Sequence, residues 1–417
     1  MAGETSGTGG AVAPGGAVTG GGAMSGEARG TDGGRGAGGW GSLAGLKVVD
    51  LSRVLGGPYA TQILADHGAE VIKVEPPQGD ETRHWGPPFV TEGVAWYFAG
   101  VNRNKKSVVL DLRGDEGRAR LLELLSDADV LVENFKPGSL EKWGLGYAEV
   151  LSQRFPRLVH CSITGFGEDG PLGGLPGYDA VVQAEAGLMS VNGTAESGPT
   201  RIGMPAVDMI TGLNAVNGIL MAIHERGRSG QGQRVETTLF DCGISVMHPH
   251  MPNYFASGKV PELTGNDHPN IAPYSTFRTG SGDVAITVGN NGQFAKLCEY
   301  LGIPEAAADP RFAENSDRCA HRPELRKLLE DAMADSDAAT VAQGLMAIGV
   351  PCGAINTVDK VVEHPHAVHR KMFVEFDDGY RGVASPVKMS RTPAEYRLPP
   401  PRHGEHTDEV FWVDMRG

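Results

Sequence analysis

The strongest constraint on the fold is an alternation of short apolar runs with helix-forming segments. Residues 46–51 and 70–75 are rich in branched apolar side chains, as buried strands are. Between them, Pro58 suits the first turn of a helix and Gly68 suits its end. A strand, a helix and a strand within about thirty residues form a βαβ unit. The sequence therefore predicts a parallel sheet with right-handed crossovers.

The same alternation continues further along the chain. A helix is expected over residues 115–128, because leucines recur along one side of it. The further expected strands are 107–112, 129–133 and 158–163. Repeated strand–helix units of this kind predict an α/β fold with a doubly wound, Rossmann-like sheet.

The pattern after residue 179 is mainly helical. Helices are expected over 207–224 and roughly 233–248, and the Pro, Gly and Asn residues of 249–273 predict a linker. A strand at 283–288 followed by helices near 292–301, 323–333 and 338–347 predicts a small α+β domain. The predicted parts are a disordered Gly-rich tail (1–42), a large domain (43–248), the linker (249–273), the small domain (274–345) and a C-terminal segment (346–417).

Net charge, apolar runs and cysteine spacing limit which partners and which cell compartment are expected. A formal net charge of −14 argues against nucleic acid or an anionic membrane as the main partner. No run approaches the roughly 20 apolar residues of a membrane span, and residues 1–40 lack the apolar core of a signal peptide. The five cysteines show no C-x-x-C pair. Buried structural thiols and a cytoplasmic location are therefore expected.

Several familiar site motifs are missing from the sequence. There is no P-loop, no G-x-S-x-G nucleophile motif, and no G-x-G-x-x-G in the first turn after a strand, residues 53–58. His364, His366 and His369 lie close together, but Pro365 disfavours presenting them on a helix, and no acidic residue or cysteine completes a metal set. A structural loop is expected there, and no metal site.

Two loops at predicted strand ends carry amides and cations. They are residues 102–107 (NRNKKS) and 134–138 (NFKPG). In an open α/β sheet, ligands bind at the carboxyl ends of the strands, and lysines with exposed backbone amides suit phosphate groups. The alternative is that both loops are solvated turns.

A glycine-rich loop, residues 165–178, leads to Asp179 at the start of an expected helix. Glycines let the backbone approach a ligand closely and expose its amides. Asp179 is either a helix cap, which is common for such an acid, or an attacking carboxylate.

These segments together resemble the class III coenzyme A transferases, the family of formyl-CoA transferase and carnitine CoA-transferase. The resemblance covers nearly all of residues 43–417. The matching motifs are residues 46–52 with 57–58, 68–75, 102–107, 132–138, 176–179 with 183–184, and 404–409.

The resemblance implies that Asp179 is the nucleophile on acyl-CoA and small carboxylic acid substrates, without a metal or a prosthetic group. It also implies a large CoA-binding domain formed by both chain ends, so that 346–417 returns to it, and an interlocked homodimer with the active site between subunits. The implied CoA contacts are Val54, Leu55, Gly56, Asn102, Arg103, Asn104, Lys105, Asn134, Phe135, Lys136, Lys142, Thr164, Gly165, Phe166 and Gly167.

Two departures from formyl-CoA transferase bear on the substrate. Pro76 follows Glu75 where that enzyme has an arginine, and residues 265–270 stand where it has a run of glycines. The pattern is more similar to relatives that use succinyl-CoA and other dicarboxylates. Candidates to bind the far carboxylate of a diacid are Arg53, Arg83 and Arg201.

Two alternative functions remain open on the same fold. A 2-methylacyl-CoA racemase would use the aspartate for proton exchange, and such racemases typically carry a histidine before it, where this chain has Tyr178. A non-catalytic acyl-CoA binding protein would not need the Asp179 carboxylate for its role.

Overall fold

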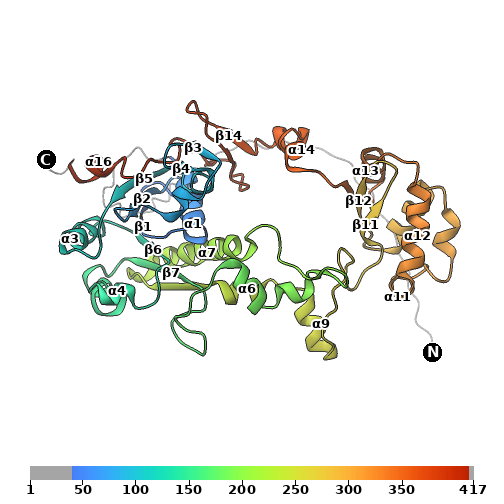
Figure 1. Cartoon of the computed structure of the whole chain (residues 1–417), viewed down its shortest axis with the longest axis horizontal. Coiled ribbons are helices and arrows are strands. Elements are labelled where there is room, and N and C mark those ends of the chain that lie inside the picture. Colours follow the sequence, from blue (N-terminus) through green and yellow to red (C-terminus); the bar gives the residue numbers. More distant parts are fainter. Residues whose placement is uncertain (1–39, 413–417) are drawn as a thin grey trace, which may run out of the picture. The chain divides into compact units, whose positions relative to one another are not determined.

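The computed structural model describes residues 40–412. Its main sheet has six strands, all parallel, in the order β10-β7-β6-β1-β2-β5 (Figure 1). The strands are β1 (Lys47–Asp50), β2 (Glu70–Glu75), β5 (Lys105–Val109), β6 (Val130–Glu133), β7 (Val159–Thr164) and β10 (Arg234–Thr238). The predicted α/β class with a parallel sheet is confirmed.

The strand order has one reversal. From β1 the chain proceeds outward through β2 and β5, then returns to add β6, β7 and β10 on the other side of β1. The reversal therefore lies between β1 and β6. The segments that follow these two strands turn away in opposite directions, and this leaves a crevice at their carboxyl ends.

Apolar side chains alternate between the two faces of this sheet. Val48 belongs to the cluster under α1 (Gly56–Asp66) and α7 (Ala206–Ser229), which pack on each other. The next residue, Val49, belongs to the cluster on the opposite face, with α3 (Asp115–Leu124). This alternation is the period of two of a strand that is buried on both sides.

Shorter elements complete this part of the chain. The helices are α2 (Trp96–Ala99), α4 (Ser139–Lys142), α5 (Ser152–Arg154), α6 (Asp179–Glu185) and α8 (Leu239–Ser245). Short two-stranded ribbons are formed by β3 (Phe89–Thr91) with β4 (Val94–Ala95) and by β8 (Gly193–Thr194) with β9 (Gly198–Pro199).

One expected helix is wrong. Residues 233–248 form strand β10 followed by the shorter helix α8, and β10 pairs with β7 at the edge of the sheet. The β-branched residues Val235, Thr237 and Thr238 favour a strand. The expected loop at the three histidines is also wrong, because Pro365–His369 is the short helix α15 with proline in its first turn, where no amide donor is needed.

A separate hydrophobic cluster draws on residues 272–354. It packs the sheet β11-β12-β13 (Tyr274–Arg278, Asp283–Thr287, Cys352–Ala354) against four helices, of which all but Asn315–Ala320 match the expected helices closely. These helices are α10 (Asn291–Tyr300), α11 (Asn315–Ala320), α12 (Arg322–Met333) and α13 (Ala338–Ala347). The expected linker contains a helix, α9 (His250–Ser257). The predicted domain boundaries stay a prediction.

The two ends of the described chain contact the main part of the fold. Near the C-terminus, the His406 amide donates to the Ser107 carbonyl at 2.9 Å, and α16 (Thr407–Trp412) packs on β5. The remaining elements are α14 (Val358–Val362), β14 (Phe373–Glu375) and β15 (Arg381–Val383). Most of the predicted tail lies outside the described residues, but Trp40 lies under the Arg397 guanidinium.

Helix α7 is the one helix within residues 40–412 that is long and apolar enough to span a membrane. It packs against α1, β7 and β10, and a core helix of a folded domain passes the same test. Cys161, Cys242 and Cys298 are buried as expected, whereas Cys319 and Cys352 are partly exposed.

Candidate active site

A cavity of about 390 Å³ opens at the carboxyl ends of β1, β6 and β7. Its position is the crevice that the strand order predicts. Most of the lining comes from the loops after these three strands and from the segment before α6, and single residues come from the 3₁₀ turn Glu81–His84, α7 and α8. The lining residues are Arg53, Val54, Leu55, Gly56, Glu81, Asn134, Phe135, Lys136, Pro137, Ile163, Thr164, Gly165, Gly174, Leu175, Pro176, Gly177, Tyr178, Asp208 and Leu239.

The loop after β1 is held in an unusual conformation. Val54 has a φ of 68°, and this left-handed region is strongly disfavoured for a β-branched residue. Asn134, from the loop after β6, accepts from the Arg53 amide at 2.8 Å and donates to the Arg53 carbonyl at 2.7 Å. These two hydrogen bonds hold the two loops together across the strand reversal. A strained backbone such as that of Val54 is typical of functional sites.

Arg53 and Lys136 supply the positive charge of the cavity. Within residues 40–412 neither side chain forms an ion pair, and the buried Arg53 Nε has no hydrogen-bond partner. Both residues and Phe135 also line an adjoining cavity of about 310 Å³. The Arg53 guanidinium lies over the Phe135 ring, 5.7 Å from its centre, within the range of a cation–π contact.

Asp179 is the first residue of α6, and it does not cap that helix. Its carboxylate instead accepts from the first turn of α7, with Oδ2 at 2.8 Å from the Val207 amide and 3.2 Å from the Asp208 amide. Gln183 donates to Oδ1 at 2.6 Å. Free amides at a helix N-terminus favour a negative charge. Asp179 is 7% exposed and lies behind the lining, between the lining residues Tyr178 and Asp208.

Asp208 is a second carboxyl group beside Asp179. Burial, together with the nearby Asp179 charge, raises the pKa of Asp208 to about 7. Sequence reasoning missed this residue, because a single acid in the first turn of a helix is a common feature. Only the fold brings it to the cavity.

The glycine-rich loop closes on itself. A Cβ atom on Gly165 would lie 2.7 Å from the Gly177 Cα, which is closer than side-chain packing permits. The two glycines thus let the ends of the loop meet, and this contact sets where Tyr178 and Asp179 follow.

The implied CoA contacts divide into two groups. Eight of them line the cavity: Val54, Leu55, Gly56, Asn134, Phe135, Lys136, Thr164 and Gly165. The other seven do not line it: Asn102, Arg103, Asn104, Lys105, Lys142, Phe166 and Gly167.

Residues 102–105 are buried with partners of their own. Arg103 is ion-paired with Asp66 through two bonds of 3.0 and 2.6 Å. Lys105 donates to Asp50 at 3.1 Å and to Asn102 at 2.9 Å. Burial is the main reason that the pKa of Lys105 falls to about 8. Their cations are therefore committed inside the fold and are not presented to the cavity.

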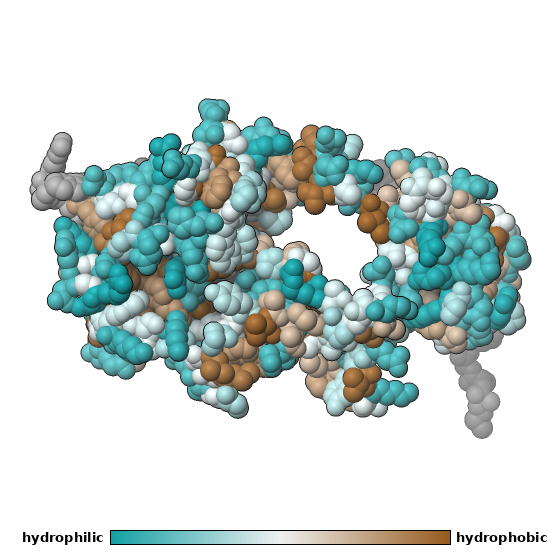
Figure 2. Space-filling model, viewed as in Figure 1, coloured by the Kyte–Doolittle hydropathy of each residue, from teal (hydrophilic) through white to brown (hydrophobic). Residues whose placement is uncertain are grey.

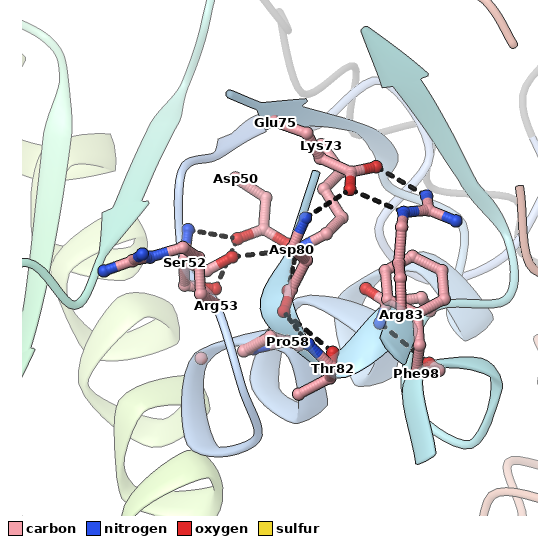
Figure 3. A network of polar contacts seen from close by, with 12 residues as sticks. Asp50, Ser52, Arg53, Pro58, Lys73, Glu75, Asp80, Thr82, Arg83 and Phe98 are labelled. Atoms are coloured by element: carbon pink, nitrogen blue, oxygen red, sulfur yellow. Dashed lines mark hydrogen bonds and ion pairs between the residues drawn. The ribbon is translucent and has the colours of Figure 1, made fainter. Parts of the chain in front are cut away.

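A buried charge network lies next to the cavity (Figure 3). Lys73 donates to the Ser52 carbonyl at 2.8 Å and to Asp80 at 3.0 Å. Arg83 donates to both carboxylate oxygens of Glu75, at 2.7 and 2.6 Å. In Figure 3 the Arg53 side chain points away from this network.

The three arginines proposed for a diacid differ in availability. Arg83 is committed to Glu75, and it also lies 3.8 Å above the Phe98 ring. Arg201 donates to the carbonyls of Ile202 and Gly203, and it does not line the cavity. Arg53 alone of the three faces the cavity.

Known proteins match most of the chain. It is 41% identical over 379 residues to the succinate–glutarate CoA-transferase of Agrobacterium fabrum, covering 88% of this chain and 94% of that one. It is 38% identical over 385 residues to the succinyl-CoA:mesaconate CoA-transferase of Haloarcula hispanica, covering 89% and 96%. A crystal structure of a CAIB/BAIF family protein from Brucella suis superposes with a TM-score of 0.81 at 44% identity, covering 90% and 99%.

The family model for CoA-transferase family III matches residues 43–407. This match confirms the resemblance that the sequence motifs indicated, and with it the transferase class of the enzyme. The chain belongs to CoA-transferase family III.

Proposed function

We propose that the enzyme transfers CoA from a dicarboxylyl-CoA such as succinyl-CoA to a second carboxylic acid, with Asp179 as the nucleophile. The observation that carries this proposal is the Asp179 carboxylate, held by the first turn of α7 between two cavity-lining residues. The relatives named above for succinate, glutarate and mesaconate support the choice of dicarboxylates.

The reaction proceeds by exchange at the Asp179 carboxylate. Asp179 attacks the thioester carbon, a mixed anhydride forms, and the C–S bond breaks to release CoA thiolate. The thiolate then attacks the aspartyl carbonyl, giving an aspartyl-CoA thioester and free donor acid. The acceptor carboxylate reverses both steps and leaves as its CoA ester. Each step exchanges one acyl bond for another, so the thioester energy is retained.

CoA lies across the cavity and its neighbour. Arg53, Phe135 and Lys136 line both spaces, so one extended molecule can bridge them. The two unpaired cations suit its phosphates, and Phe135 with Trp143 offers aromatic surface for the adenine ring. The eight lining residues are thus retained as CoA contacts, whereas residues 102–105 support the site from behind.

Exposed apolar side chains support the predicted homodimer. Leu213, Leu220 and Met221 of α7 and Phe255 of α9 are exposed, and Figure 2 shows hydrophobic residues at the surface around α9. Large apolar side chains gathered on a surface mark protein interfaces. A cytoplasmic location is also proposed, supported by five free cysteines.

The test is to trap the covalent intermediate. Enzyme mixed with succinyl-CoA and hydroxylamine should carry a hydroxamate on Asp179, located by peptide mass spectrometry. The variant Asp179→Asn keeps the shape of the side chain and should lose both the adduct and transfer of CoA to glutarate, by roughly 10³-fold or more. Asp169→Asn, at an exposed position of the same loop, is the matched control and should retain both.

Two results would overturn the mechanism. One is transfer by the wild-type enzyme with no adduct on Asp179. The other is exchange of solvent deuterium into the acyl α-carbon without transfer to any acid, which is the racemase outcome.

A further inference from the structure

Asp208 faces the cavity from the first turn of α7. It is among the lining residues, and its side chain lies toward Gly56 at the start of α1, where a Cβ would be 3.8 Å from Asp208 Oδ1. No described residue donates a hydrogen bond to its carboxyl group, in contrast to Asp179 with three donors. The fold thus leaves the Asp208 carboxyl group unused and directed at the space where a substrate would bind.

Its position relative to Asp179 is fixed by the backbone. The Asp208 amide donates to Asp179 Oδ2 at 3.2 Å, so one residue supports the nucleophile with its main chain and faces the cavity with its side chain. Two adjacent carboxylates repel each other when both are charged, which favours a proton on one of them. Asp179 has amide donors for its charge, and Asp208 has none.

We propose that Asp208 acts as a neutral carboxylic acid that donates a hydrogen bond to the thioester carbonyl oxygen while Asp179 attacks the carbon. This inference rests on the proposed function, because it assumes that Asp179 is the nucleophile. As the bond from Asp179 to carbon forms, the carbonyl electron pair moves to oxygen, and the Asp208 proton stays on Asp208 while bonding to that oxyanion. When the C–S bond breaks, the carbonyl reforms and Asp208 is unchanged.

The surroundings agree with an acid that is protonated below pH about 7. The titratable groups that interact with Asp208 are Asp179 from α6 and Tyr97 from α2. The other charged or titratable groups that line the same cavity are Arg53 and Lys136 from the loops after β1 and β6, Glu81 from the 3₁₀ turn Glu81–His84, and Tyr178 before α6. The raised pKa of Asp208, about 7, follows from burial and from Asp179. Burial is the main reason that the pKa of Tyr97 is raised, so that phenol stays neutral.

The test is the pH profile of kcat/KM for succinyl-CoA:glutarate transfer between pH about 6 and about 9. Wild-type activity should fall above pH 7 as Asp208 ionises. Asp208→Asn keeps a hydrogen-bond donor that does not titrate, so it should retain activity within about tenfold and lose this fall. Asp208→Ala should lower kcat by roughly 10²–10³-fold with a smaller change in KM. Glu81→Gln, another acid of the same cavity, should keep the wild-type fall.

Three outcomes would overturn the proposal: an unchanged fall above pH 7 in Asp208→Asn, wild-type kcat in Asp208→Ala, or loss of the fall in Glu81→Gln. Circular dichroism of each variant checks folding, and the Asn variant carries the test if the Ala variant unfolds. The hydroxylamine adduct separates this proposal from the one it rests on. If wild-type enzyme forms the adduct but the Asp208→Asn profile is unchanged, only the role of Asp208 fails. If no adduct forms, both fail.

Discussion

The cations near the strand ends fall into two sets that are organised in opposite ways. Lys73, Lys105 and Arg83 are almost fully buried, and each is ion-paired with a carboxylate. Arg53 and Lys136 face the cavity, and among the described residues neither has a carboxylate partner. The first three cations, the internal set, are neutralised within the fold, so replacing one of them should lower the free energy of unfolding. Arg53 and Lys136, the external set, are available to a ligand, so replacing one of them should weaken substrate binding.

The largest expected effect comes from breaking the internal set. Arg83→Met removes the partner of Glu75 and leaves that carboxylate buried, which should lower the free energy of unfolding by about 3–5 kcal/mol. Urea unfolding followed by circular dichroism measures it. The matched control is Arg113→Met, whose partner Asp111 is exposed, and this exposed pair should change stability by at most about 1 kcal/mol. Equal losses in the two variants would contradict the comparison.

The ion pair between Arg83 and Glu75 should also make the free energy of unfolding depend on pH. Burial opposes ionisation of Glu75, but the Arg83 hydrogen bonds and the Lys73 charge outweigh it and hold the pKa at about 2, below the ordinary 4.5. The ionised form is therefore favoured by folding, and its contribution, on the order of 3 kcal/mol, is present above pH 4.5. It should be lost as the pH falls from 4.5 toward 2. Glu75→Gln should show a flatter stability profile over this range, and an identical profile would contradict the assignment.

At the cavity we expect a smaller effect, on substrate binding and not on stability. Arg53→Met should raise KM for succinyl-CoA about tenfold, since one charged contact contributes roughly 1.4 kcal/mol, and it should leave urea unfolding almost unchanged. Steady-state kinetics and urea unfolding on the same preparation measure both. A variant that is destabilised but binds CoA normally would place Arg53 in the internal set.

The smallest effect is expected at Lys136. Its flexible ammonium is a point charge without the planar fork of arginine, so Lys136→Met should raise KM about threefold, and less at high salt. The ratio of the KM changes in Arg53→Met and Lys136→Met compares the contributions of these two cations to substrate binding. A KM that responds to salt equally in the variant and in the wild type would remove Lys136 from CoA binding.

The sequence predicted the parallel sheet well, because apolar runs such as 46–51 and 70–75 are bounded by clear helix signals. It missed β10, because Arg234–Thr238 is short, polar and placed directly before a helix. Pairing with β7 determines its conformation, and pairing is a property of the fold. At the histidine segment, Pro365 disfavours a helix interior but is compatible with a first turn, and it occupies the first turn of α15.

Part of the cavity lining could be expected from the sequence, because neighbouring parallel strands bring their carboxyl ends to one edge of the sheet. Residues 134–136, expected at a strand end, and residues 54–56, implied by the family resemblance, all line the cavity, and their contact with CoA stays a prediction. The sequence could not distinguish a cation that faces a ligand from one that pairs internally. Lys105 and Lys136 occur in similar polar runs, and only the positions of Asp50 and Asn102 show that Lys105 is committed.

The contact between Gly165 and Gly177 has a practical consequence for engineering. The loop is closed at its base by this contact and by the Gly174 amide, which donates to the Gly167 carbonyl at 2.9 Å. A change at its exposed tip, residues 168–171, should therefore not displace Asp179. Exposed loop tips tolerate insertions best. A peptide tag or a fluorescent reporter inserted between Asp169 and Gly170 should therefore leave the hydrogen bonds of Asp179 in place.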